Sequence, residues 1–386
     1  MKTTLKIKYG QPSWRLAAGA VELFVTQTGA HVGPMTFRLG DRKIQPFSVA
    51  PWAEEDTPKS LPPMLKALRG DFFCLPFGGN ETPLGGERHP PHGDTANRCW
   101  TLEAAQPGQL HLSLRTKARK GRVDKFVSLQ PDQTAVYQRH VISGMSGPMG
   151  FGHHAMLKFP DRPGCGRIST SRFLRGQVAP IPFEKPEARG YSSLRPGARF
   201  QSLREVPMQT GELADLSRYP ARRGYEDLVL LESDPRLPFA WTAVTFSEEG
   251  YVWFALKNPR ILRQTILWLS NGGRHYAPWN GRHVGVLGLE EVTSYFHYGL
   301  AESAAKNPIA ASGQPTCQPM NPAEPLEINY VMALAAVPRK FDEVKTVTPA
   351  ADGKSVKLTA GNGVSVNVSL DLAALGLGML KLTPVS

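Results

Sequence analysis

The chain lacks any long apolar run. None of its segments reaches the ~18 consecutive apolar residues that a membrane-spanning helix needs. Its first residues, MKTTLKIKYGQPSW, contain no apolar core typical of a secretion signal. We therefore expect a cytoplasmic protein that does not enter a membrane.

Cysteine is also scarce, with residues only at positions 74, 99, 165 and 317. None of them forms a CxxC pair, which argues against a zinc knuckle or a thioredoxin-type centre. His275 and His283 flank one loop, but no third ligand accompanies them. We expect reduced thiols and neither a metal ion nor another cofactor.

Long helical periodicity is nearly absent, and only residues 61–70, 211–219 and 300–307 fit short helices. The rest is predicted as short strands, rich in β-branched and aromatic residues and separated by Gly, Pro, Asn and Asp. The 37 Gly and 34 Pro favour a loop-rich all-β sandwich over a series of βαβ units. No fixed-period repeat indicates a propeller or a solenoid.

The composition changes near residue 340. The following segment, which begins KFDEVKTVTPAADGKSVKLTA, alternates like strands and has no aromatic residue beyond Phe341. We expect one continuous domain over residues 1–340 and a small C-terminal β appendage over residues 341–386.

Acidic residues are fewer than basic ones, 33 against 45, and the formal net charge is +12. The densest basic run, RTKARKGRVDK at 115–125, lies between two strand-like segments, as expected for a solvated hairpin tip. We therefore expect no nucleic-acid partner. Scattered arginines better suit a small carbohydrate, including an anionic sugar or a sugar phosphate.

Three polar islands interrupt the strands. They are RGDFFCLPFGGN with RHPPHGDTANRCW between 69 and 100, FGHHAMLKFP at 151–160, and GGRHYAPWNGRHVGVLGLEEVTSYF at 272–296. Each is rich in Gly or Pro and carries titratable groups, which is more than packing alone requires. Three such islands on one β scaffold indicate an enzyme.

In their order and rough spacing, these islands resemble the galactose mutarotase-like superfamily, which includes aldose 1-epimerases and glucose-6-phosphate 1-epimerase-like proteins. RGDFFCLPFGGN is similar to the arginine-bearing RGG…P.FG segment, and PPHGDTANRCW to P.HGFAR…W. GHHAML resembles G.HP.F, and VLGLEEVTSYF resembles the segment that ends in Leu-Glu-Pro. The resemblance covers residues 15–335.

The resemblance implies a β-supersandwich with a sugar site in its concave face. It also implies an isomerase that interconverts the anomers of a free or phosphorylated sugar. The sequence departs from the family where HGDTANR replaces HGFAR and where Glu291 and Ala155 replace prolines. The family's substrate therefore does not transfer directly.

Anomer interconversion needs a base for the anomeric hydroxyl and an acid for the ring oxygen. The predicted base is Glu290, which ends an apolar run, whereas its neighbour Glu291 faces the opposite side of a strand. The alternative is a structural carboxylate paired with an arginine such as Arg282.

The predicted acid is His154, because only one of the consecutive His153 and His154 can point into a pocket. The family pattern favours His154, and His153 is kept as a substrate-binding alternative. His92 precedes Gly93, which permits close approach of a ligand, and the family places this histidine near the ring oxygen.

Four further residues are predicted to bind the sugar. Arg69 offers forked donors to hydroxyls, and Asp227 offers a carboxylate. Trp279 and Asn280 offer a stacking face and an amide.

Two other functions remain open, because a fold alone does not decide activity. One is a silent carbohydrate-binding protein, in which Glu290 and His154 would not face each other across a cavity. The other is a polysaccharide-active enzyme, such as a lyase using Tyr276 and Arg274.

Overall fold

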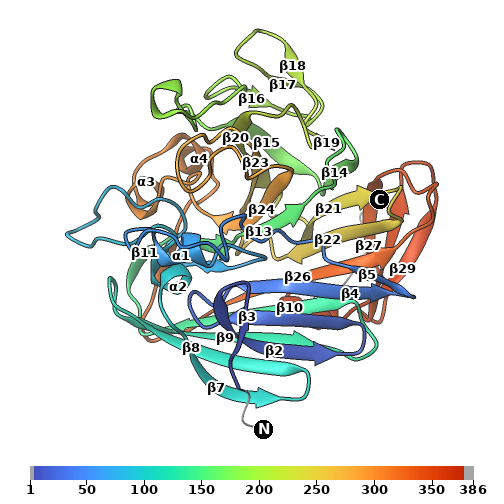
Figure 1. The fold of residues 1–386 in the computed structure, drawn as a ribbon, viewed down its shortest axis with the longest axis horizontal. Coiled ribbons are helices and arrows are strands. Elements are labelled where there is room, and N and C mark those ends of the chain that lie inside the picture. The colour runs from blue at the N-terminus through green and yellow to red at the C-terminus, as the bar shows by residue number, and fades with distance from the viewer. Residues whose placement is uncertain (1–3, 378–386) are drawn as a thin grey trace.

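The computed structural model describes residues 4–377, and three large antiparallel sheets form most of its fold (Figure 1). The first has five strands in the order β1-β2-β3-β4-β5 and is built from the N-terminal residues. Its strands are β1 (Lys6–Lys8), β2 (Gln11–Ala18), β3 (Val21–Thr26), β4 (Val32–Leu39) and β5 (Arg42–Ile44).

The second sheet has nine strands in the order β19-β14-β21-β22-β26-β10-β9-β8-β7. The late strand β26 lies between β22 and β10 and joins the two halves of this sheet. The strands are β7 (Thr101–Gln106), β8 (Gln109–Thr116), β9 (Gly121–Leu129), β10 (Ala135–Ser143), β14 (Gly166–Thr170), β19 (Arg218–Tyr219), β21 (Ala240–Phe246), β22 (Tyr251–Lys257) and β26 (Leu326–Ala336).

The third sheet has eight strands and carries the candidate site. Its order is β16-β15-β20-β23-β24-β12-β6, with β13 also paired to β24. The strands are β6 (Phe73–Cys74), β12 (Phe151–His153), β13 (Ala155–Lys158), β15 (Phe173–Val178), β16 (Arg199–Phe200), β20 (Tyr225–Ser233), β23 (Gln264–Asn271) and β24 (Val286–Thr293).

Apolar side chains join these sheets into a sandwich. One large cluster combines residues of the five-stranded sheet and of the eight-stranded sheet with the inner face of the nine-stranded sheet. A second cluster covers the other face of the eight-stranded sheet, where α1 and the surrounding loops pack. The central strands β20, β23 and β24 are therefore buried on both faces. The predicted all-β supersandwich is confirmed.

The predicted C-terminal appendage contains a three-stranded sheet of β27 (Val344–Pro349), β28 (Ser355–Ala360) and β29 (Ser365–Ser369). Its apolar residues share a third cluster with Trp241, Phe254 and Val331 of the nine-stranded sheet. Residues 378–386 of the predicted appendage lie outside the described residues. The division into two domains stays a prediction.

The remaining elements are short. Two small ladders join β11 (Gly147–Met149) to β25 (Gln318–Met320), and β17 (Val206–Pro207) to β18 (Leu213–Ala214). The helices are α1 (Pro63–Lys66), α2 (Gly93–Asn97), α3 (Leu300–Ala304), α4 (Pro308–Ala311), η1 (Pro186–Ala188) and η2 (Leu372–Leu375). No helix in the described part of the chain has the length and apolar character needed to cross a membrane.

The helix predicted over residues 211–219 is wrong. That segment contains β18 and β19 instead. Gly211 adopts a φ of 91°, and the Asp215 carboxylate accepts hydrogen bonds from the backbone and hydroxyl of Ser217. Such a local turn competes with helix formation, and pairing with β17 and β14 then fixes the short strands.

Candidate functional site

A cavity of about 140 Å³ opens on the face of the eight-stranded sheet that α1 and the loops cover. Its polar lining comes from His92, His154, Arg274, Glu290 and His297. The apolar lining is Met64, Leu65, Leu68, Phe183, Leu228, Trp268 and Trp279, together with Gly79. Three sequence islands that lie far apart in the chain therefore meet at one place.

Glu290 reaches this cavity from the central strand β24. The alternation of the strand turns Glu291 to the opposite face, where it pairs with Lys257 and accepts hydrogen bonds from Thr242 and Thr265. Because Glu291 is held by three partners between the sheets, Glu290 is the carboxylate available to the cavity. Arg282 pairs with Glu55, so the alternative of an Arg282 partner for Glu290 is not realised.

His154 lies at the junction of β12 and β13, and its backbone N–H donates to the carbonyl of Phe72. Its ring stacks on the Phe72 ring at 4.6 Å between centroids. The Nε2 atom lies 3.2 Å from Oε1 of Glu290. The predicted acid and base are therefore direct neighbours in the structure.

Burial controls the protonation of this pair. It raises the pKa of Glu290 well above its ordinary value and lowers the pKa of His154 well below its ordinary value, because a low-dielectric site disfavours both charged forms. The positive charge of Arg274 acts against burial at Glu290 and lowers that pKa. Burial therefore favours the neutral form of each side chain, a carboxylic acid at Glu290 and an uncharged imidazole at His154.

His92 stands beside the pair, with its ring centroid 5.1 Å from that of His154. It is the residue before α2 and has a φ of 57°. Its Nδ1 atom contacts the Cys74 thiol at 3.3 Å and accepts from the Gly78 backbone N–H at 3.5 Å. Burial lowers the pKa of His92 to about 4, so the ring is neutral and carries its proton on Nε2.

Arg274 supplies the positive charge of the cavity, whereas the sequence suggested it only for the alternative of a polysaccharide lyase. Its Nε atom lies 2.6 Å from Glu184, and its guanidinium carbon lies 4.5 Å above the Trp279 ring and 5.3 Å above the Trp268 ring. Within residues 4–377 its two terminal amino groups make no hydrogen bond. Those donors are free to meet a ligand in the cavity.

Two acidic side chains support this wall of the cavity. Glu184 also accepts a hydrogen bond from the Tyr276 hydroxyl at 3.2 Å. Glu226 accepts from the Trp268 indole at 2.9 Å and from the Ser270 hydroxyl at 2.9 Å, and burial raises its pKa to about 7. The hydrogen bond to Glu226 fixes the orientation of Trp268. The two carboxylates lie close enough to Arg274 to stabilise its positive charge.

The predicted stacking residue Trp279 lines the cavity, whereas its neighbour Asn280 is exposed and does not. The Asn280 backbone has a φ of 45°, which places it at the turn of the loop. Trp279 packs edge-on against Trp52 at 4.8 Å between centroids. An amide contact from Asn280 to a ligand is therefore not supported.

Three other predicted binding residues lie in the interior and do not line the cavity. Arg69 is fully buried and donates to the carbonyls of Ala67, Lys8 and Tyr9. These bonds occupy its guanidinium. The geometry thus corrects the prediction that Arg69 binds the sugar.

His153 and Asp227 are corrected in the same way. The Nδ1 atom of His153 lies 2.9 Å from Asp71 on the opposite side of the sheet from His154. The Asp227 carboxylate accepts from the Ser193 hydroxyl at 2.6 Å and from the backbone N–H groups of Ser193 and Leu194. Both side chains organise backbone and interior contacts.

The alternation of side chains along the strands could have revealed some of the site residues that the sequence analysis missed. Glu226, Trp268 and Glu290 occupy strand positions that share the covered face of the eight-stranded sheet, as Leu228 does. Arg274 and Glu184 lie on loops, and only the three-dimensional structure brings them together. Among the described residues, no group of three or more His, Cys, Asp or Glu side chains is arranged to hold a metal ion.

The fold of this chain matches solved structures, although its sequence matches no family model. No family model and no curated protein sequence matches the chain. Solved structures do match: an Escherichia coli protein described as a candidate aldose 1-epimerase superposes with a TM-score of 0.58 at 13% identity, covering 85% of this chain and 100% of its own. A galactose mutarotase related enzyme from Lactobacillus acidophilus gives 0.54 at 11% identity, covering 86% and 100%.

A galactose mutarotase-like protein from Lactobacillus casei gives a TM-score of 0.52 at 10% identity, covering 84% of this chain and 100% of its own. The chain therefore has the galactose mutarotase-like fold, and the resemblance predicted from the sequence is confirmed at the level of the fold. At these identities, the activity has to be argued from the site itself.

Proposed function

We propose that this protein interconverts the anomers of a monosaccharide by opening and reclosing the sugar ring. The observation that carries the proposal is the contact of 3.2 Å between His154 Nε2 and Glu290 Oε1 inside the cavity. A carboxyl group and an imidazole that line one cavity can offer one acid and one base to the same ligand. That is the minimum requirement for ring opening.

The proposed step keeps the number of protons on the pair constant. The base takes the proton of the anomeric hydroxyl while the acid gives its proton to the ring oxygen, and the bond between the anomeric carbon and the ring oxygen breaks. Rotation of the free aldehyde and reclosure on its other face reverse both transfers. Each positioned proton transfer is typically worth ~10²–10⁴-fold in rate.

Arg274 supports the roles predicted for the pair. Its charge opposes the effect of burial on the pKa of Glu290 and so favours the carboxylate form that the proposed base requires. Its free amino groups also offer two donors to sugar hydroxyls. In this proposal Arg274 has the binding role that the sequence analysis gave to Arg69.

The size of the cavity favours a single sugar. Its volume of about 140 Å³ lies below the ~300–1,000 Å³ common for drug-sized ligands. A polysaccharide chain would need a longer groove, and the Tyr276 hydroxyl that a lyase would use donates to Glu184. Glu290 and His154 both line this cavity, which likewise favours an enzyme over a silent binding protein.

Saturation-transfer NMR of anomer exchange, with a panel of free and phosphorylated aldoses, tests this proposal. Wild type is expected to accelerate exchange for at least one sugar, and Glu290→Gln is expected to lose at least ~10²-fold of that rate while the sugar still binds. Exchange that is unaffected by Glu290→Gln would remove Glu290 as a reacting group. The panel also decides between free and phosphorylated substrates. The cytoplasmic location is untested by this experiment and stays a prediction.

A further inference from the structure

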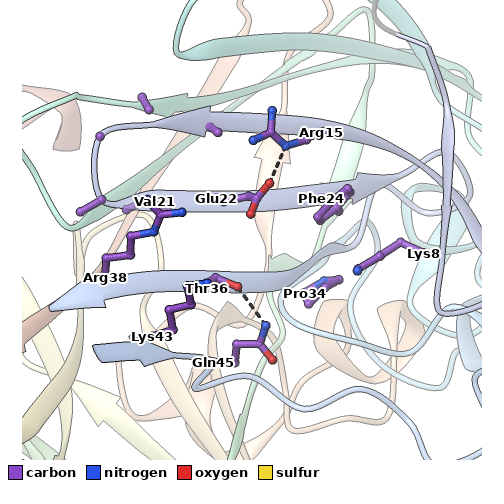
Figure 2. Close-up of a pocket in the computed structure, with 14 residues that line it drawn as sticks. Lys8, Arg15, Val21, Glu22, Phe24, Pro34, Thr36, Arg38, Lys43 and Gln45 are labelled. Carbon is purple, nitrogen blue, oxygen red and sulfur yellow. Dashed lines mark hydrogen bonds and ion pairs between the residues drawn. The ribbon is translucent and has the colours of Figure 1, made fainter. Parts of the chain in front are cut away.

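A second cleft lies on the outer face of the five-stranded sheet and shares no lining residue with the candidate site. Its volume is about 570 Å³. Figure 2 shows the side chains of β2, β3, β4 and β5 that project into it, with Lys8 at one side. The polar lining is Lys8, Arg15, Glu22, Thr36, Arg38, Lys43 and Gln45.

The cleft carries an excess of positive charge. Four of its lining residues are cations and only Glu22 is acidic. Glu22 is already paired with Arg15 (Figure 2). Within residues 4–377, no carboxylate pairs with Lys8, Arg38 or Lys43. Three positive charges therefore face this cleft without an internal counter-charge.

Two of these cations are placed against each other. Arg38 on β4 and Lys43 on β5 are direct cross-strand partners, and both line the cleft. Like charges directly opposite in an antiparallel pair are destabilising. An anionic group bound between them would relieve this repulsion.

The apolar side chains that line the cleft are mostly small. This small-residue floor includes Ala17, Gly19, Pro34 and one aromatic ring, Phe24. The Lys8 ammonium lies 5.3 Å from the centre of that ring. A surface of this kind accepts a broad, rigid ligand with one stacking contact and several charge contacts. Its volume is about four times that of the catalytic cavity (570 against 140 Å³).

We propose that this cleft binds an acidic oligosaccharide, that is, a short glycan bearing carboxylates. The pyranose rings would lie on the small-residue floor and against Phe24. The carboxylates would contact Arg38 and Lys43 at one end and Lys8 at the other. This site is independent of anomer exchange, because it uses no residue of the cavity that holds Glu290.

Phe24 argues against a single-stranded nucleic acid as the occupant. Proteins that bind single strands use several aromatic side chains on which successive bases stack, whereas Phe24 is the one aromatic residue among the described residues that line this cleft. Because a nucleic acid and an anionic membrane also carry negative charge, the experiment has to distinguish both from a glycan.

Isothermal titration with tetragalacturonate tests the proposal in the full-length protein. Wild type is expected to bind it and not to bind neutral maltotetraose. Arg38→Gln/Lys43→Gln is expected to weaken binding about fivefold or more, as loss of two exposed charge contacts predicts. These side chains are exposed, so the variant is expected to fold and to keep any anomer exchange.

The matched control is Lys354→Gln/Lys357→Gln, which removes the same charge from exposed positions of the C-terminal region. It is expected to bind tetragalacturonate like wild type, as is Glu290→Gln. An equal loss in the control pair would show a general charge effect and overturn the site. Tighter binding of a dT12 oligonucleotide or of phosphatidylserine vesicles than of the glycan would also overturn it.

Discussion

His153 and His154 are consecutive residues whose rings lie on opposite faces of the eight-stranded sheet. His154 meets Glu290 in the cavity, whereas His153 meets Asp71 between the sheets. Asp71 also accepts from Gln138 at 2.7 Å. Two identical side chains therefore have different roles, which follow from the alternation of the strand alone.

Alanine substitutions should separate these roles. His154→Ala is expected to lower anomer exchange at least ~10²-fold, since one proton transfer is lost. His153→Ala is expected to lower the free energy of unfolding by ~1–3 kcal/mol, because it removes a buried hydrogen-bond partner of Asp71. NMR exchange rates and urea denaturation on both variants check this. A folded His153→Ala without exchange would contradict the assignment.

The two arginines offer a second contrast. Arg274→Lys keeps a positive charge near Glu184 but loses the free guanidinium amino groups. The affinity for the sugar is therefore expected to fall about tenfold, with little change in the free energy of unfolding. Arg69→Lys loses donors to buried carbonyls and is expected to cost ~1–3 kcal/mol of stability, with unchanged binding per folded molecule. The fluorescence of the nearby Trp268 and Trp279 reports binding in each case. The reverse pattern would restore Arg69 to the site.

Residue patterns identified only part of this cavity. Glu290, His154, His92 and Trp279 could be chosen because strand alternation and short motifs act over a few residues. The choice of Arg69 failed because its partners, the carbonyls of Lys8 and Tyr9, belong to a segment about 60 residues away. No local pattern encodes such a contact.

At the scale of elements, α2 and the turn before it position His92. Gly93 has a φ of 76°, and a side chain added there would lie 1.8 Å from the carbonyl oxygen of Leu75. Glycine therefore allows the close approach of two backbones. As a consequence, the His92 ring lies against Cys74 of β6.

Gly93→Ala should disturb both the fold and the site. The backbone strain and the clash with Leu75 are expected to cost ~1–3 kcal/mol or more, and displacement of His92 is expected to weaken sugar binding. Gly85→Ala is the control, since Gly85 has a φ of 57° but nothing within 4 Å of an added side chain. Urea midpoints and binding isotherms for both variants check this. Equal effects would mean that backbone conformation alone matters.

At the scale of the whole molecule, buried histidines link stability to pH. Burial lowers the pKa of His31, His283 and His297 to about 3 and that of His92 to about 4. An unfolded chain binds protons to these groups near pH 6.5, and the folded chain does not. Their contribution to stability is therefore present above pH 6.5 and is lost as the pH falls toward 3–4.

Urea denaturation at pH 7.5, 6.5, 5.5 and 4.5 should show a falling midpoint below pH 6.5. Each of these histidines contributes up to ~1.4 kcal/mol per pH unit in that range. Glu226, with a raised pKa of about 7, and Glu290, whose pKa burial also raises, act in the opposite direction and offset part of this loss. A constant midpoint down to pH 4.5 would contradict the burial of neutral histidines.

The order of the nine-stranded sheet has a consequence for synthesis. β26 ends at Ala336, yet it is the strand that joins β22 to β10. On a ribosome, the earlier strands of both halves emerge with their central edges unpaired and exposed, and such edges attract other chains. The sandwich cannot close until β26 (Leu326–Ala336) has been made, so a nascent chain of this protein is expected to present unpaired strand edges to chaperones.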